Sequence, residues 1–153
     1  MKNLITSLLL MAAIATVTAC DKDEDKTPAN TKNLSGTMSS AQVIPAIAVV
    51  STAIGNATAT YDMDKNILNY NVTYSGLTGS PVACHFHIGA PGVKGAVAFA
   101  APNLPTTPSG TITDTSVPLT QSQEVELLKG NFYVNMHTNA NKDGEIRGNI
   151  TVK

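Results

Sequence analysis

The sequence predicts one all-β domain, an antiparallel Greek-key sandwich or barrel of seven to eight strands with one short helix. Three observations lead to this fold class. Short apolar-rich runs alternate with turn residues from residue 34 onward. Residues 67–74 alternate apolar and polar side chains with the period of two that is typical of a half-buried strand. The chain has 153 residues, which suits one domain once a processed segment is removed.

The N-terminus predicts a lipoprotein signal peptide over residues 1–19. A basic start precedes an apolar stretch that is too short for a permanent membrane span. Val17-Thr18-Ala19-Cys20 resembles the lipobox of bacterial lipoproteins, in which the cysteine is lipidated and becomes the new N-terminus. The alternative is an ordinary cleaved secretory signal. We expect a lipid-anchored protein of the bacterial cell envelope, at the outer membrane or the cell surface.

Residues 20–33 follow as the lipidated cysteine and a flexible acidic tether, because this polar, charged segment cannot bury enough apolar surface to fold. Residues 34–153 form the predicted domain. Residues 27–153 carry seven basic and seven acidic side chains, and the chain has a single arginine. This balance excludes a nucleic-acid partner. The membrane is expected as a partner only through the lipid anchor.

Each predicted element follows from its local pattern. The turn-rich residues 62–66 separate two of the runs, so residues 57–61 and 67–74 are predicted to form a hairpin. The expected strands are residues 34–39, 57–61, 67–74, 82–88, 96–99, 110–117, 131–137 and 145–152. The expected core includes Tyr70, Phe86, Val134 and Met136, with Cys84 as a buried free thiol.

Two further segments differ from the strand pattern. Residues 103–108 are too rich in proline for a central strand and are predicted to be a surface connection. Residues 120–129 are predicted to form a short helix. Thr120 is a suitable N-cap, Gln123 stands three residues later, and Gly130 follows the end of the segment.

All three histidines lie in two predicted strands. Alternation places His85 and His87 on one face of the first strand, opposite Phe86, and places His137 on the polar face of the second. Imidazole nitrogens bind copper and zinc well, and three of them leave an open position on the ion. We therefore predict a copper or zinc site at these three residues. The alternative is that all three are surface or hydrogen-bonding histidines.

Three residues are candidates for a supporting role around this site. Tyr133 shares the polar face of the second strand. Glu145 and Arg147 either pair with each other, or Glu145 orients a histidine while Arg147 draws an anion toward the metal. Residues 89–95, which contain three glycines and a proline, predict a loop that can fold over the histidine face without supplying a ligand.

Residues 34–153 resemble the CHRD domain, a module named from chordin that is also found in many bacterial secreted proteins. The resemblance is carried by residues 85–92, 128–138 and 143–148. It implies the fold and leaves the activity open. The chain also resembles copper-zinc superoxide dismutase, a Greek-key barrel, which implies that the three histidines match copper ligands and Arg147 an anion-guiding arginine. The bridging histidine, the zinc-site residues and the disulfide of that family have no counterpart here.

The expected function is that of an envelope-anchored lipoprotein whose three-histidine face binds copper or zinc, for metal sequestration or redox protection. One alternative is a metal-free adhesion or protein-interaction module, and another is a superoxide dismutase-like oxidoreductase. No serine or cysteine nucleophile stands in an activating motif, and no pair of carboxylates is marked out by the sequence. We therefore predict no catalytic residue and favour a protein that is not an enzyme.

Overall fold

The computed structural model of the protein describes residues 30–153. The predicted signal peptide at residues 1–19, the lipidated Cys20 and the tether up to residue 29 lie outside the described residues. Residues 31–33, predicted as the end of the tether, are instead the first residues of a strand, because they pair with residues 60–62. Within residues 30–153, no helix is long and apolar enough to cross a bilayer.

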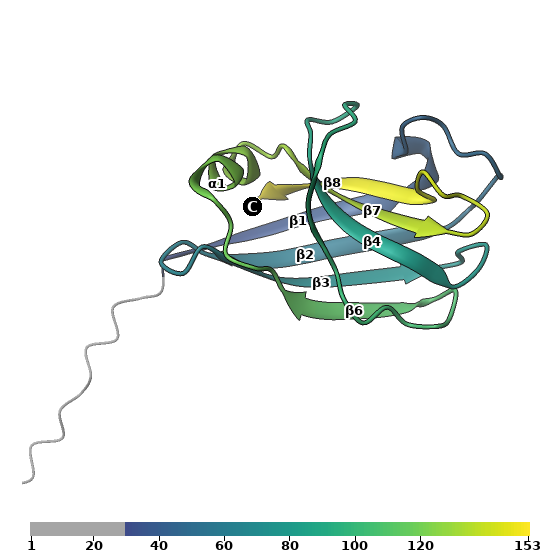
Figure 1. The fold of residues 1–153 in the computed structure, drawn as a ribbon, viewed down its shortest axis with the longest axis horizontal. Coiled ribbons are helices and arrows are strands. Elements are labelled where there is room, and N and C mark those ends of the chain that lie inside the picture. The colour runs from purple at the N-terminus through teal and green to yellow at the C-terminus, as the bar shows by residue number, and fades with distance from the viewer. Residues whose placement is uncertain (1–29) are drawn as a thin grey trace, which may run out of the picture.

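Eight antiparallel strands form a single sheet (Figure 1). They are β1 (Thr31–Ser39), β2 (Ile54–Asp62), β3 (Ile67–Ser75), β4 (Pro81–Ile88), β5 (Val97–Ala100), β6 (Gly110–Thr115), β7 (Phe132–Thr138) and β8 (Ile146–Val152). Their order in the sheet is β5-β4-β7-β8-β1-β2-β3-β6. A 3₁₀ helix, η1 (Ser40–Gln42), follows β1, and one α-helix, α1 (Gln121–Leu128), precedes β7. The predicted fold class is confirmed.

The sheet curls so that its two halves meet across one apolar core. Tyr70 of β3 and Phe86 of β4 come from opposite halves, and their ring centroids are 4.6 Å apart. Phe86 also stacks on Phe99 of β5, with centroids 4.5 Å apart. The four predicted core residues, Tyr70, Phe86, Val134 and Met136, are all buried, and so is the free thiol of Cys84.

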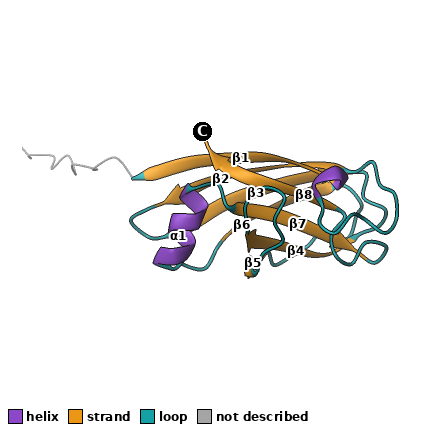
Figure 2. Cartoon of the chain, turned by 90° about the horizontal axis from the view of Figure 1, so that it is seen from above, coloured by secondary structure: helices purple, strands orange, loops and turns teal. Residues whose placement is uncertain are grey.

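The short helix begins and ends where its sequence predicts. The Thr120 hydroxyl accepts a hydrogen bond from the Gln123 backbone N–H, and the Gln123 side chain accepts one from the Thr120 N–H. This reciprocal pair satisfies two N–H groups that a helix start leaves without partners. Gly130 follows the helix with a φ of 80°, which glycine adopts without strain. Figure 2 shows α1 at one end of the sheet and η1 at the other.

Strand ends differ from the prediction by up to three residues. β2 begins at Ile54 rather than at residue 57, because its pairing with β1 continues to Ser39. β6 ends at Thr115 rather than at residue 117. These shifts follow from pairing with neighbouring strands, which local alternation does not report.

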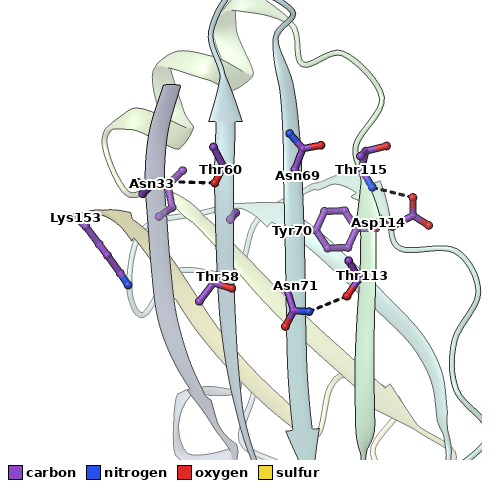
Figure 3. A pocket seen from close by; sticks show the side chains of 12 residues that line it. Asn33, Thr58, Thr60, Asn69, Tyr70, Asn71, Thr113, Asp114, Thr115 and Lys153 are labelled. Carbon is purple, nitrogen blue, oxygen red and sulfur yellow. Dashed lines mark hydrogen bonds between the residues drawn. The ribbon is translucent and has the colours of Figure 1, made fainter. Parts of the chain in front are cut away.

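The outer face of β1, β2, β3 and β6 carries uncharged polar side chains in three cross-strand rows. The rows are Asn33-Thr60-Asn69-Thr115, Ser35-Thr58-Asn71-Thr113 and Thr37-Asn56-Thr73-Thr111. A depression of about 530 Å³ lies on this face, and Figure 3 shows the hydrogen bonds Asn33–Thr60 and Asn71–Thr113 within it. None of the three histidines lines the depression.

Candidate metal centre

His85 and His87 of β4 and His137 of β7 converge on one small region. β4 and β7 are neighbours in the sheet, and His137 lies opposite Ala83, which makes it diagonal to His85. One ring nitrogen from each histidine lies within 4.8 Å of the other two. The convergence predicted from strand alternation is therefore present in the structure.

One pair of nitrogens already has the separation that a shared ion requires. His85 Nδ1 and His137 Nε2 are 3.2 Å apart. Two nitrogens that bind a tetrahedral ion at about 2.0 Å lie about 3.3 Å from each other. The ligand atoms of all three histidines lie within 4.8 Å of one another, so the His87 nitrogen has to come closer to this pair before all three bind one ion.

Backbone carbonyls select the tautomers of two of the rings. His87 Nδ1 lies 3.0 Å from the carbonyl oxygen of Gly95, and His137 Nδ1 lies 2.8 Å from that of Lys142. Since a carbonyl oxygen only accepts hydrogen bonds, each Nδ1 carries the proton and donates it. The Nε2 atom of each ring is then left with its lone pair, which is the arrangement that metal-binding histidines use.

The Nε2 atom of His87 is buried and has no hydrogen-bond partner among the described residues. A buried polar atom without a partner is uncommon and costs free energy. His87 as a whole is 9% exposed, so water reaches it poorly. No donor within the described residues uses the lone pair of His87 Nε2, so this nitrogen is available to bind an ion.

Burial favours the neutral form, which binds metals, for His85 and His87. It lowers the pKa of His85, with a further contribution from His137, and it lowers the pKa of His87 against the opposing effect of the Gly95 carbonyl. A histidine with a lowered pKa is neutral at pH 7 and has a lone pair available.

Tyr133 lies between a histidine and an arginine. Its ring stacks on His87, with centroids 4.7 Å apart and planes 4° from parallel. The guanidinium carbon of Arg147 lies 3.5 Å from the centre of the same ring. Because β7 lies between β4 and β8, His87 and Arg147 approach Tyr133 from opposite sides. Tyr133 therefore holds the His87 ring in place by direct contact.

The glycine-rich loop at residues 89–95 covers this stack. The Gly95 N–H donates to the Tyr133 hydroxyl over 3.1 Å, and Arg147 Nη2 donates to the carbonyl oxygens of Val93 and Ala90. As a result, Tyr133 and Arg147 are 2% exposed. The sequence predicted the cover, but not that the polar face of β7 would be buried beneath it.

Glu145 does not join the histidines. It is fully buried, and its carboxylate accepts hydrogen bonds from the hydroxyls of Ser51, Thr78 and Thr138 and from the Thr78 N–H. It makes no ion pair with Arg147, and the ion pairs within residues 30–153 involve other residues. Neither predicted role for Glu145, pairing with Arg147 or orienting a histidine, matches these contacts.

The groups that orient the histidines are the backbone carbonyls of Gly95 and Lys142. Sequence reasoning missed both, because every residue has a carbonyl and no side-chain pattern marks one that contacts a ring. The only available signal was the turn-rich character of the two segments that contain them, residues 89–95 and 139–144.

A family model of the CHRD domain matches residues 34–150. This range includes all three histidines, the covering loop, Tyr133 and Arg147. No curated protein and no solved structure matches the chain.

Proposed function

This chain belongs to the CHRD domain family, and we propose that its domain binds one copper or zinc ion through His85, His87 and His137. The protein would do so as a lipoprotein of the bacterial cell envelope, where it would serve in metal sequestration or redox protection. The observation that supports this proposal best is the buried, unpartnered Nε2 of His87 beside the close pair of nitrogens from His85 and His137.

The chemistry of the three donors favours copper or zinc over harder cations. Neutral imidazole suits both metals, whereas magnesium and calcium prefer oxygen ligands. No carboxylate belongs to the cluster within the described residues. Three nitrogen ligands leave a coordination position open, which suits an exchangeable ion better than a closed structural one.

The test is a metal titration of protein purified without a histidine tag. We expect one copper or zinc ion per domain. The His87→Ala variant should bind more than about 100-fold more weakly, since loss of a ligand should exceed the 10- to 100-fold effect of losing a supporting group. Binding should weaken under acid conditions as protons compete for the rings, and for His85 and His87 this begins below the usual imidazole pKa.

The matched control is Cys84→Ser, on the opposite face of β4. Cys84 is buried in the core, and burial raises the pKa of its thiol to about 12, so it provides no thiolate at neutral pH. Its replacement should leave the metal affinity unchanged. Unchanged copper and zinc affinity in the triple histidine variant would instead favour a metal-free adhesion or interaction module.

The proposed anchor has its own test. Cys20 follows Val17-Thr18-Ala19, so we expect a mature protein that begins at a lipidated Cys20 and partitions with membranes. The Cys20→Ala variant should be found in the soluble fraction after cell lysis. Mass spectrometry of the mature N-terminus would report the lipid directly, and an unmodified N-terminus at another residue would disprove the anchor.

A superoxide dismutase-like activity remains the less favoured proposal. Arg147, which would guide the anion, donates to loop carbonyls and lies across the Tyr133 ring from His87. A dismutation assay on copper-loaded protein separates an enzyme from a metal-binding protein, and we expect no activity above that of free copper.

A further inference from the structure

A cavity of about 500 Å³ lies on the outer side of β1 and β8. It is bounded by η1 and the following Ile44 on one side and by Pro91 and Gly92 of the covering loop on the other. Its volume is within the range of small-molecule sites in proteins, about 300 to 1,000 Å³. The cavity is distinct from the histidine cluster, because none of the three histidines lines it.

Arg147 is the single charged residue in the wall of this cavity. Its side chain is 2% exposed, and burial lowers the pKa of its guanidinium. A buried cation is normally paired with a carboxylate. The ion pairs within residues 30–153 are Lys65–Asp62, Lys94–Asp143 and Lys129–Glu126. The described chain therefore contains a buried arginine that no acidic side chain neutralises.

The protein contacts of Arg147 leave part of its guanidinium unused. Both of its hydrogen bonds come from Nη2, to the carbonyl oxygens of Val93 and Ala90. A guanidinium has five N–H groups. Nε and Nη1 have no hydrogen-bond partner among the described residues and are not sealed from solvent, so the small exposure of Arg147 includes these two atoms. This edge is the part that can meet a ligand in the cavity.

The remaining wall is neutral and polar. Thr37 of β1 and Thr151 of β8 bring exposed hydroxyls to it, and Gln42 of η1 brings an amide. The Gln42 amide nitrogen donates to the Thr37 carbonyl and the Ser39 hydroxyl, which leaves its oxygen as an acceptor. A ligand that fits this wall has hydroxyl groups in addition to one negative charge.

We propose that this cavity binds a small hydroxylated monocarboxylate, such as a sugar acid, with its carboxylate on Arg147 and its hydroxyls on the threonine and glutamine side chains. The carboxylate supplies the counter-charge that the chain lacks, and a charge-assisted hydrogen bond is stronger than a neutral one. The ligand does not reach the proposed metal, because the Tyr133 ring separates Arg147 from His87.

The test uses D-glucuronate as the probe and protein treated with a chelator, so that its outcome does not depend on the proposed metal site. Calorimetric titration should show binding of glucuronate, and glucose, which has hydroxyls without the carboxylate, should bind at least tenfold more weakly. The Arg147→Gln variant should lose at least tenfold in affinity. The Lys94→Gln variant removes an exposed cation of the same loop and should change affinity less than twofold.

An experiment on the unmodified sequence covers the case in which Arg147→Gln fails to fold. In amide chemical-shift mapping, glucuronate should perturb Thr37, Gly92 and Thr151 and leave His85 and His137 unperturbed. Absence of binding at tens of millimolar, equal affinity for glucose and glucuronate, or shifts confined to residues outside the cavity would each overturn the proposal. Acetate binding as tightly as glucuronate would overturn the role given to the hydroxyls.

Discussion

Replacing Phe86 by alanine is expected to lower the free energy of unfolding by about 3 to 5 kcal/mol. Phe86 is fully buried, stacks on Phe99 and meets Tyr70 from the opposite half of the curled sheet. Removing the ring leaves a cavity at the contact that joins the two halves, and surrounding side chains relax only partly into such a space. Chemical denaturation followed by circular dichroism measures the change.

The matched control for this variant is Val82→Ala on the same strand. The Val82 side chain is 50% exposed, so its truncation should change the free energy of unfolding by less than about 1 kcal/mol. A loss at Phe86 no greater than the loss at Val82 would show that the Phe86 ring does not belong to the core.

Replacing Glu145 by alanine is expected to cost at least about 3 kcal/mol, because it removes the acceptor of four hydrogen bonds, and a hydrogen bond to a charged group contributes about 1.5 to 3 kcal/mol. Its carboxylate accepts hydrogen bonds from Ser51, Thr78 and Thr138, which belong to three segments that meet at one end of the sheet. The control is Asp143→Ala, an exposed carboxylate of the same turn region, 3.8 Å from Lys94. Its loss should cost less than about 1 kcal/mol.

The charge of Glu145 also predicts how stability depends on pH. Burial raises the pKa of this carboxyl, but the hydrogen bonds from Ser51, Thr138 and Thr78 outweigh burial and lower it. A carboxyl whose pKa is lower in the folded protein stabilises the fold above its unfolded pKa, about 4.3. That contribution is lost as the pH falls through the folded pKa.

The Glu145→Gln variant tests this dependence, because glutamine keeps the shape of the side chain and has no charge to lose. The free energy of unfolding of the unmodified protein should decrease more steeply than that of the variant below about pH 4.3. Parallel curves for the two proteins in acid would mean that Glu145 is not the group responsible.

Local patterns in the sequence were sufficient for the fold class and for most elements. Alternation in residues 67–74 has one interpretation, since a half-buried strand is the only element with that period. The reciprocal hydrogen bonds of Thr120 and Gln123 are local as well, which is why the helix is predicted within one residue at each end. The order of strands in the sheet depends on long-range pairing, and no local pattern reports it.

In the candidate site too, local patterns predicted some residues correctly and long-range contacts determine the others. His85, His87 and His137 were found together because strand alternation assigns faces. The hydrogen bonds of Glu145 could not be predicted from the sequence, because its partners Ser51 and Thr78 lie 94 and 67 residues away in the chain. The spacing of the two residues suggested that Glu145 pairs with Arg147. Arg147 instead donates a hydrogen bond to a carbonyl oxygen of the covering loop. Side-chain and backbone hydrogen bonds between distant segments determine the positions of Glu145 and Arg147.

The position of β8 determines when the domain can fold during its synthesis. β8 is the last of the eight strands in chain order, yet it pairs on both sides, with β7 and with β1. Without β8, the other strand pairings divide into two groups, β5-β4-β7 and β1-β2-β3-β6, and the edges of β7 and β1 that pair with β8 have no partner. The sheet therefore cannot close before translation reaches residues 146–152.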